Sequence, residues 1–101
     1  MTQETLRIIE AIKSVPEGKV SSYRDIALSA GIPNGARQVA RILHSMTDSQ
    51  HLPWHRIIKS DGYIAFPEGE SRDIQCALLR AEGVAVSKTG RVCYEKYSAW
   101  V

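Results

Sequence analysis

Apolar residues recur every three to four positions along four stretches of the chain, which is the spacing of amphipathic helices. The first predicted helix runs from Thr5 and ends at the turn residues Pro16-Glu17-Gly18. The second opens at the pattern Ser22-Tyr23-Arg24-Asp25, a capping box with Asp in place of the usual Glu or Gln, and Gly31 with Pro33 closes it. Local signals alone therefore predict the boundaries of both helices.

The third and fourth predicted helices follow the same spacing. The third begins near Asn34-Gly35 and buries Val39, Leu43 and Met46. The fourth ends at a glycine, and the apolar residues that it carries at helical spacing are Ile74, Ala77, Leu78 and Ala81. A helix, a short turn containing Gly and Pro, and another helix form the helix-turn-helix pattern, which the second and third helices match.

Short β segments are predicted between and after these helices. Arg56 to Lys59 is a candidate strand, and Ser60-Asp61-Gly62 is a candidate turn. Near the C-terminus, Val84-Ala85-Val86 and Val92-Cys93-Tyr94 flank a turn at Lys88-Thr89-Gly90, which predicts a hairpin, the wing of a winged helix. The predicted fold is mostly α with a small β hairpin, a winged helix-turn-helix.

The composition fits one globular domain over residues 1–101 and argues against several other classes of protein. Hydrophobic residues make up 44% of the chain and charged residues 24%, which suits one core and does not suit a disordered chain. No apolar stretch approaches a membrane span, and the N-terminus lacks the features of a signal peptide. Cys76 and Cys93 have no paired-ligand spacing and are interpreted as reduced thiols, so we expect a cytoplasmic protein, nucleoid-associated if bacterial.

Positive charge is concentrated on one face of the third predicted helix. The net charge is only +2, so bulk charge does not predict nucleic-acid binding. Arg37, Arg41 and His44 nevertheless lie at i, i+4 and i+7, and no acidic residue lies between Asn34 and Met46. A helix-turn-helix presents this helix to DNA, so we expect the two arginines to contact DNA. A solvated basic surface is the alternative interpretation.

Motifs for metal binding, hydrolysis or phosphate cradling are not found in the sequence. The three histidines lack the spacing of a zinc site, no Gly-x-Ser-x-Gly motif supplies a nucleophile, and no Gly-rich phosphate loop is present. We therefore expect no metal and no cofactor. The unusual segment is Pro53-Trp54-His55-Arg56, in which a lone tryptophan would ordinarily be a core residue.

Four motifs closely resemble the C-terminal domain of O6-alkylguanine-DNA alkyltransferases, in the same order and over nearly the whole chain. The motifs are Val15-Pro16-Glu17-Gly18-Lys19-Val20-Ser21-Ser22-Tyr23, Gly35-Ala36-Arg37-Gln38-Val39, Pro53-Trp54-His55-Arg56-Ile57-Ile58 and Ala81-Glu82-Gly83-Val84. The family's active-site motif is Pro-Cys-His-Arg, and its cysteine is the nucleophile. Trp54 stands in that position here, which is the signature of the alkyltransferase-like proteins, the non-catalytic branch of the family.

The resemblance implies recognition without alkyl transfer. Transfer needs a thiolate, whereas the indole of Trp54 has only an N–H to donate. His55 and Glu82 match the family's base and the carboxylate that orients it. We expect this pair to hold the shape of the site, and we expect no catalytic residue.

Two further positions match family residues that rotate a nucleotide out of the duplex. The resemblance implies that Tyr23 presses on the 3′ phosphate, and that Arg37 enters the base stack through the minor groove and fills the vacated place. The small residues Gly35, Ala36 and Ala40 are expected to let the helix approach the groove closely. The alternatives are a core aromatic at position 23 and a phosphate contact or bare surface arginine at position 37.

The same resemblance outlines a pocket for the flipped base. Trp54 is expected to line it, and Ser60 is expected to contact the flipped nucleotide or its phosphate. Arg56 is expected to tie the active-site loop, which carries the Pro53-Trp54-His55-Arg56 motif, to the third predicted helix, the recognition helix of the helix-turn-helix. The loop from Tyr63 to Glu70 departs from the family pattern, and the segment Ile64–Pro67 predicts a bulkier, more apolar rim.

The sequence therefore predicts a protein that binds double-stranded DNA containing O6-alkylguanine, flips the lesion and leaves the alkyl group in place. The resemblance further implies that the complex marks the lesion for nucleotide excision repair, with damage-recognition machinery containing UvrA as partner. We expect a monomer that does not bind membranes. Two alternatives stay open: alkyl transfer to Cys76 or Cys93, and a sequence-specific winged-helix regulator that reads the major groove with Arg37 and Arg41.

Overall fold

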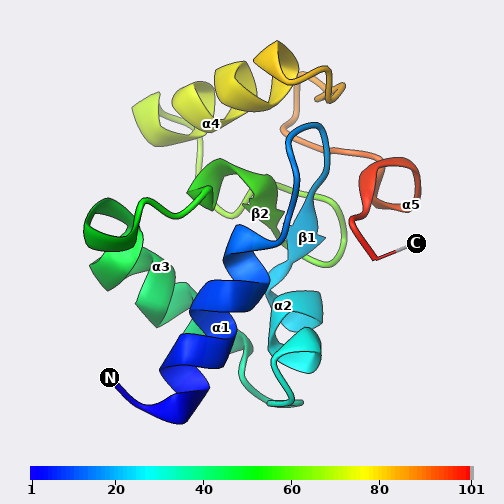
Figure 1. Cartoon of the computed structure of the whole chain (residues 1–101). Coiled ribbons are helices and arrows are strands. Elements are labelled where there is room, and N and C mark those ends of the chain that lie inside the picture. Colours follow the sequence, from blue (N-terminus) through cyan, green and yellow to red (C-terminus); the bar gives the residue numbers. More distant parts are fainter. Residues whose placement is uncertain (101) are drawn as a thin grey trace.

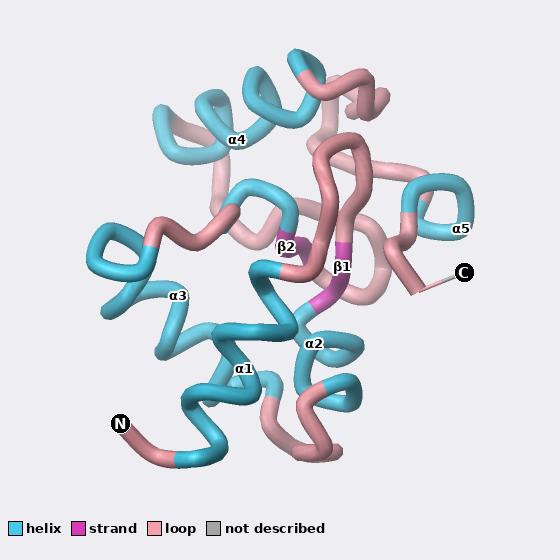
Figure 2. The backbone as a smooth tube through the Cα atoms, viewed as in Figure 1, coloured by secondary structure: helices cyan, strands magenta, loops and turns pink. Residues whose placement is uncertain are grey.

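The computed structural model describes residues 1–100, which form a small bundle of helices around a two-stranded parallel sheet (Figures 1 and 2). In chain order the elements are α1 (Gln3–Lys13), β1 (Ser21–Ser22), α2 (Tyr23–Ser29), α3 (Ala36–Gln50), the 3₁₀ turn η1 (Trp54–Arg56), β2 (Ile57–Ile58), α4 (Glu70–Ala81) and α5 (Tyr94–Tyr97). Helices α1, α2 and α3 pack together in the lower half of Figure 1, and α4 crosses the top. The strands and η1 lie between these two parts.

Strand β2 joins two hydrophobic cores. Successive side chains of a strand point to opposite faces. Ile57 accordingly packs into the core formed mainly by α1, α2 and α3, while Ile58 packs into a second core with Val20, Leu79 and Val84. Since η1 precedes β2 directly, the Pro53-Trp54-His55-Arg56 segment is fixed at the junction of the two cores.

The predicted start of α2 is confirmed, but its capping box is completed by a residue from far along the chain. The Ser22 Oγ accepts a hydrogen bond from the Asp25 N–H at 2.9 Å, as a helix N-cap does. The reciprocal bond from the Ser22 N–H goes to the Tyr94 hydroxyl at 2.9 Å, and that hydroxyl donates to the Asp25 carboxylate. An aspartate is one methylene shorter than the usual glutamate, and the tyrosine hydroxyl bridges the difference.

Helices α3 and α4 differ from the predicted burial. In α3 Val39 is buried as predicted, while Ile42 takes the second fully buried position and Leu43 and Met46 are half-buried. In α4 the apolar positions that define the pattern point outward, with Ile74 46% and Leu78 38% exposed. The interior is contacted instead by three other residues of the helix, Gln75, Cys76 and Leu79.

The predicted wing is shorter than a hairpin of two strands. The turn around Lys88-Thr89-Gly90 is present, but its arms meet only at an isolated antiparallel bridge between Val86 and Val92. The Val92 N–H donates to the Gly62 carbonyl at 2.8 Å, so this arm is shared between two neighbours. Tyr94, predicted in the second arm, begins α5. The prediction of a mostly helical fold with a small β part is nevertheless confirmed.

No helix among residues 1–100 combines the length and the apolar character needed to cross a lipid bilayer.

Candidate functional site

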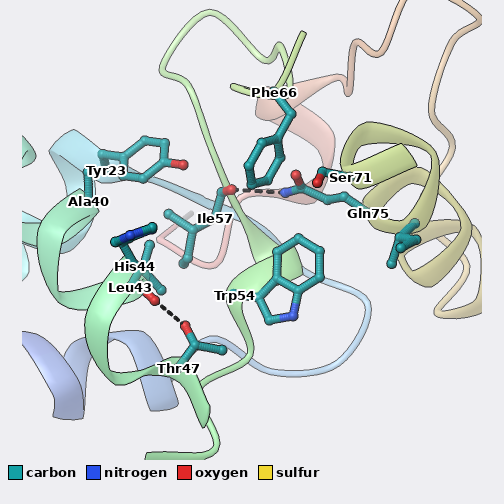
Figure 3. A pocket seen from close by; sticks show the side chains of 11 residues that line it. Tyr23, Ala40, Leu43, His44, Thr47, Trp54, Ile57, Phe66, Ser71 and Gln75 are labelled. Atoms are coloured by element: carbon teal, nitrogen blue, oxygen red, sulfur yellow. Dashed lines mark hydrogen bonds between the residues drawn. The ribbon is translucent and has the colours of Figure 1, made fainter. Parts of the chain in front are cut away.

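A cavity of about 480 Å³ lies between α3 and α4, within the size range of small-molecule sites (Figure 3). Its walls come from α2, α3, η1, β2, α4 and the loop before α4. The lining residues are Tyr23, Ala40, Leu43, His44, Thr47, Trp54, Ile57, Phe66, Ser71, Ile74 and Gln75. Most of these side chains are apolar, and a few polar groups are distributed among them.

Trp54 forms an aromatic wall of this cavity. Its indole is half-buried and meets the rings of His55 and Phe66 edge to face, each with centroids 6.2 Å apart and planes at 83°. No hydrogen bond from the indole N–H to residues 1–100 is found, so this donor is free to meet a ligand or water. An apolar wall with one N–H can hold a planar aromatic group but cannot attack it.

A carboxylate behind this wall fixes the His55-Arg56 turn. The Glu82 Oε2 lies 2.8 Å from the His55 Nε2 and 2.7 Å from the Arg56 Nη2, and its Oε1 accepts from the Arg56 Nε at 3.0 Å. The Gly18 N–H also donates to Oε1, at 3.2 Å. The Arg56 Nη1 donates to the Val15 carbonyl at 3.0 Å. The contact between His55 and Glu82 that the family resemblance implies is therefore present, and its role in holding the shape of the site stays a prediction.

The same network corrects the role predicted for Arg56. Its guanidinium bonds to Glu82 at the end of α4 and to Val15, two residues after the end of α1, rather than to α3. The physical reason is that Glu82 offers two oxygens in the geometry that a guanidinium fork matches. The hydrogen bonds from Arg56 are the largest cause that lowers the pKa of Glu82 to about 2. An ionised carboxylate only accepts, so the His55 Nε2 carries the proton of their shared hydrogen bond.

Gln75 places a fixed hydrogen-bond acceptor at the cavity wall. The residue is 2% exposed, and its Nε2 donates to the carbonyls of His55 and Ile57 at 3.0 and 3.1 Å. Figure 3 shows the bond to Ile57. Both partners are acceptors, so the amide nitrogen must face them and Oε1 must face away. Within the part of the chain that the structure describes, every buried side-chain polar atom has a hydrogen-bond partner. No bond to the Gln75 Oε1 is found there, so this oxygen is not one of the buried atoms. The oxygen is therefore left to the cavity.

Tyr23 also lines the cavity, from the first turn of α2. Its ring is half-buried and packs against the core of α1, α2 and α3. Burial raises the pKa of its phenol, so the hydroxyl stays protonated at neutral pH and can donate a hydrogen bond. Tyr23 therefore packs against the core and lines the cavity at the same time, and its expected action on the 3′ phosphate stays a prediction.

The expected DNA-binding face of α3 is exposed beside the cavity. Arg37, Arg41 and Ala36 are exposed on this helix, and Ala40 belongs to the cavity lining. Gly35 differs from the prediction, because it is buried and a Cβ there would lie 2.7 Å from the Ile32 Cγ2. This glycine serves the tight turn before α3 rather than a close approach to a ligand.

Several predicted site residues lie away from the cavity. Ser60 is exposed in the turn after β2 and is not among the lining residues. In the loop with the predicted apolar rim, only Phe66 reaches the cavity, since Ile64 is buried in the second core. Cys76 is buried in that same core, and Cys93 is exposed at the start of α5. Neither thiol lines the cavity.

Three polar lining residues, Thr47, Ser71 and Gln75, are not predicted by the sequence. Gln75 could have been identified because it is a polar residue beside the exposed apolar positions of its helix. That arrangement indicates a helix that borders a cavity as well as a core. No group of three or more His, Cys, Asp or Glu side chains among residues 1–100 could hold a metal ion.

Comparisons with known proteins relate this chain to DNA repair. Residues 3–84 match the family described as 6-O-methylguanine DNA methyltransferase, DNA binding domain. The chain is 40% identical over 97 residues to the DNA base-flipping protein of Vibrio parahaemolyticus, covering 96% of each. It is 38% identical over 86 residues to Alkyltransferase-like protein 1 of Schizosaccharomyces pombe, covering 82% of this chain and 78% of that one. The crystal structure of S. pombe Atl1 with damaged DNA containing O6-carboxymethylguanine superposes with a TM-score of 0.84 at 31% identity, covering 97% of this chain and 95% of that chain.

Proposed function

The chain belongs to the 6-O-methylguanine DNA methyltransferase family through its DNA-binding domain. On that premise we propose that it binds duplex DNA containing O6-alkylguanine, takes the flipped lesion into the cavity beside Trp54 and leaves the alkyl group attached. The observation that carries this proposal is an aromatic-walled cavity directly beside the exposed basic face of α3. The similarity to an Atl1 complex with O6-carboxymethylguanine DNA supports the same assignment.

The cavity suits a flipped base because its groups can offset the loss of stacking. Extruding a base costs a few kcal/mol, and less for a damaged base that pairs badly. An aromatic contact with Trp54 contributes about 1–3 kcal/mol, and each buried methylene of the alkyl group adds about 0.8 kcal/mol. Phe66 and Ile74 extend the apolar wall on the side of α4. Alkylated guanine is therefore held more strongly than guanine.

The absence of alkyl transfer follows from the groups available. The cavity is walled by an indole where the family has a nucleophilic thiol, and its lining contains no cysteine. Cys76 is enclosed in the second core, and Cys93 lies in another part of the fold. His55 has an ionised carboxylate partner but no thiol to deprotonate. The pair keeps η1 in shape.

Tryptophan fluorescence tests whether the lesion enters this cavity. The chain has two tryptophans, Trp54 in the cavity wall and Trp100 near the C-terminus. An O6-methylguanine duplex should quench the emission more than an identical guanine duplex, because the base contacts Trp54. In the Trp54→Phe variant the two duplexes should quench the emission equally, and the fluorescence of Trp100 still shows that DNA is bound. Equal quenching by both duplexes, or a difference that persists in the variant, would contradict the proposal.

Gln75 predicts which edge of the base is read. Alkylation at O6 removes the N1 proton, so the 2-amino group is the only hydrogen-bond donor left on the base. We expect that group to donate to the Gln75 Oε1. Replacing O6-methylguanine by O6-methylhypoxanthine, which lacks the 2-amino group, should weaken binding about tenfold, the effect of one buried hydrogen bond.

The Gln75→Met variant is the control for this preference. It keeps the length of the side chain but removes the acceptor, so it should bind the two bases with similar affinity. Its thermal unfolding should be followed in parallel, because the carbonyls of His55 and Ile57 lose a donor. Equal affinity of the wild-type protein for the two bases would show that Gln75 does not read this edge.

We also propose, from the family resemblance alone, that the bound complex recruits the damage-recognition machinery of nucleotide excision repair. Purified UvrA should then join the complex on a lesion duplex more readily than it binds the same duplex without this protein. A sequence-specific regulator would instead bind some undamaged sequence tightly and show no preference for the lesion. Both comparisons need one ionic strength, since contacts to phosphate make every affinity salt-dependent.

A further inference from the structure

The C-terminal segment from Tyr94 to Trp100 is bonded to the strand that leads into Tyr23. The Val20 N–H donates to the Tyr97 carbonyl at 2.9 Å, and the Ala99 N–H donates to the Val20 carbonyl at 2.9 Å. The indole N–H of Trp100 donates to the Ser21 Oγ at 2.7 Å. This segment lies beyond residues 3–84, which match the family model. It therefore adds a support for α2 from outside the matched region.

Tyr94 makes the contact of this segment that reaches α2 itself. Its hydroxyl accepts from the Ser22 N–H and donates to the Asp25 carboxylate, so it links the N-cap to the third residue of the helix. Tyr23 lies between these two bonded positions. The position of its ring at the cavity wall depends on the geometry of this turn as well as on its packing against the first core.

We propose that Tyr94 is a positioning residue for Tyr23, and that it closes the capping box of α2 so that Tyr23 is held in the orientation needed to flip the lesion. This inference rests on the proposed function. Ser22 is buried, so without the hydroxyl its N–H loses its partner away from water. The carboxylate of Asp25 loses a bond at the same time. The first turn of α2 then loosens, and the Tyr23 ring loses its fixed position.

Binding of undamaged DNA should not depend on this contact. The exposed arginines lie on α3, which begins after its own turn at Gly35. A Tyr94→Phe variant keeps the ring, which packs against the second core, and removes only the hydroxyl. The change should therefore act on flipping rather than on general affinity.

The test compares Tyr94→Phe with Tyr97→Phe as the matched control. Tyr97 packs against the same core, and no bond of its hydroxyl to residues 1–100 is found. Flipping is followed with 2-aminopurine beside an O6-methylguanine, and affinity is measured on lesion and intact duplexes. For Tyr94→Phe we expect lesion affinity to fall about fivefold to tenfold with a matching loss of the flipping signal, and intact-duplex affinity to stay within about twofold. Tyr97→Phe should change neither.

A second variant tests the means by which Tyr94 acts. Adding Asp25→Glu to Tyr94→Phe supplies the longer carboxylate, which can accept from the Ser22 N–H directly as in a regular capping box. Lesion affinity and flipping should then recover. Unchanged flipping in Tyr94→Phe, an equal loss on both duplexes, or no recovery with Asp25→Glu would overturn the inference. A wild-type protein without lesion preference would refute the proposed function instead, so the two failures are distinguishable.

Discussion

Replacing Arg37 by alanine should weaken binding of an O6-methylguanine duplex by roughly fiftyfold while changing binding of the intact duplex far less. Arg37 is exposed near the start of α3, beside the face that carries the cavity. We propose, from the family resemblance, that its guanidinium fills the place that the flipped base leaves, where it can stack on the neighbouring bases and remain charged. Without it the gap in the base stack stays unfilled, which makes the binding free energy less favourable by about 2–3 kcal/mol.

Arg41→Ala is the matched control for this prediction. Arg41 lies one turn further along α3, carries the same charge and is also exposed, but it is not assigned to the gap. A phosphate contact contributes equally to both duplexes, so Arg41→Ala should lower the two affinities by similar factors. If Arg37→Ala leaves lesion affinity within a factor of two, or behaves like Arg41→Ala, its assigned role is wrong. Both variants are measured by fluorescence anisotropy at one ionic strength.

Replacing Glu82 by alanine should lower the stability of the folded protein. The side chain is 11% exposed and accepts hydrogen bonds from His55, Arg56 and the backbone of Gly18. Its pKa of about 2, against 4.5 without these partners, corresponds to about 3 kcal/mol of preference for the ionised form in the folded state. The total free energy of unfolding of a domain of this size is only about 5–15 kcal/mol. Because the substitution also leaves Arg56 and His55 without their acceptor, urea unfolding should report a loss of stability on the order of a few kcal/mol.

The same carboxylate predicts how stability changes with pH. The folded-state pKa lies below the unfolded one, so between them the unfolded chain binds more protons and stability rises with pH. The contribution of Glu82 is fully present above about pH 5 and is lost as the pH falls toward about 2. In Glu82→Ala this part of the pH dependence should disappear. The exposed Glu68 serves as control, and Glu68→Ala should keep both the stability and its pH profile. A wild-type pH profile in Glu82→Ala would contradict this assignment.

Local signals predicted the parts of the fold that are decided locally. The start of α2 follows from Ser22, because a cap and its helix are only three residues apart. The His55–Glu82 pair is not local, and it is expected only because the family resemblance places its two motifs together. The turn around Gly90 follows from turn residues. In each case the residues that decide the structure are named by a short motif.

The parts that the sequence did not predict depend on contacts between distant segments. Which face of α4 is buried depends on a cavity on one side of the helix and a core on the other, so its apolar stripe meets the cavity at Ile74. Arg56 bonds to Val15 and Glu82, which lie far apart in the sequence. The link between Tyr94 and α2 spans most of the chain. The spacing of apolar residues along the chain contains no information about such contacts between distant segments.

We infer that this domain holds an alkylated guanine and has no group with which to repair it. The most direct measurement titrates the protein with O6-methylguanine and guanine duplexes of one sequence, and then determines the intact mass of the protein and the base composition of the recovered DNA. We predict tighter binding of the lesion duplex, an unchanged protein mass and full recovery of O6-methylguanine. Equal affinity for the two duplexes, or one methyl group gained by the protein as guanine is restored, would contradict the claim.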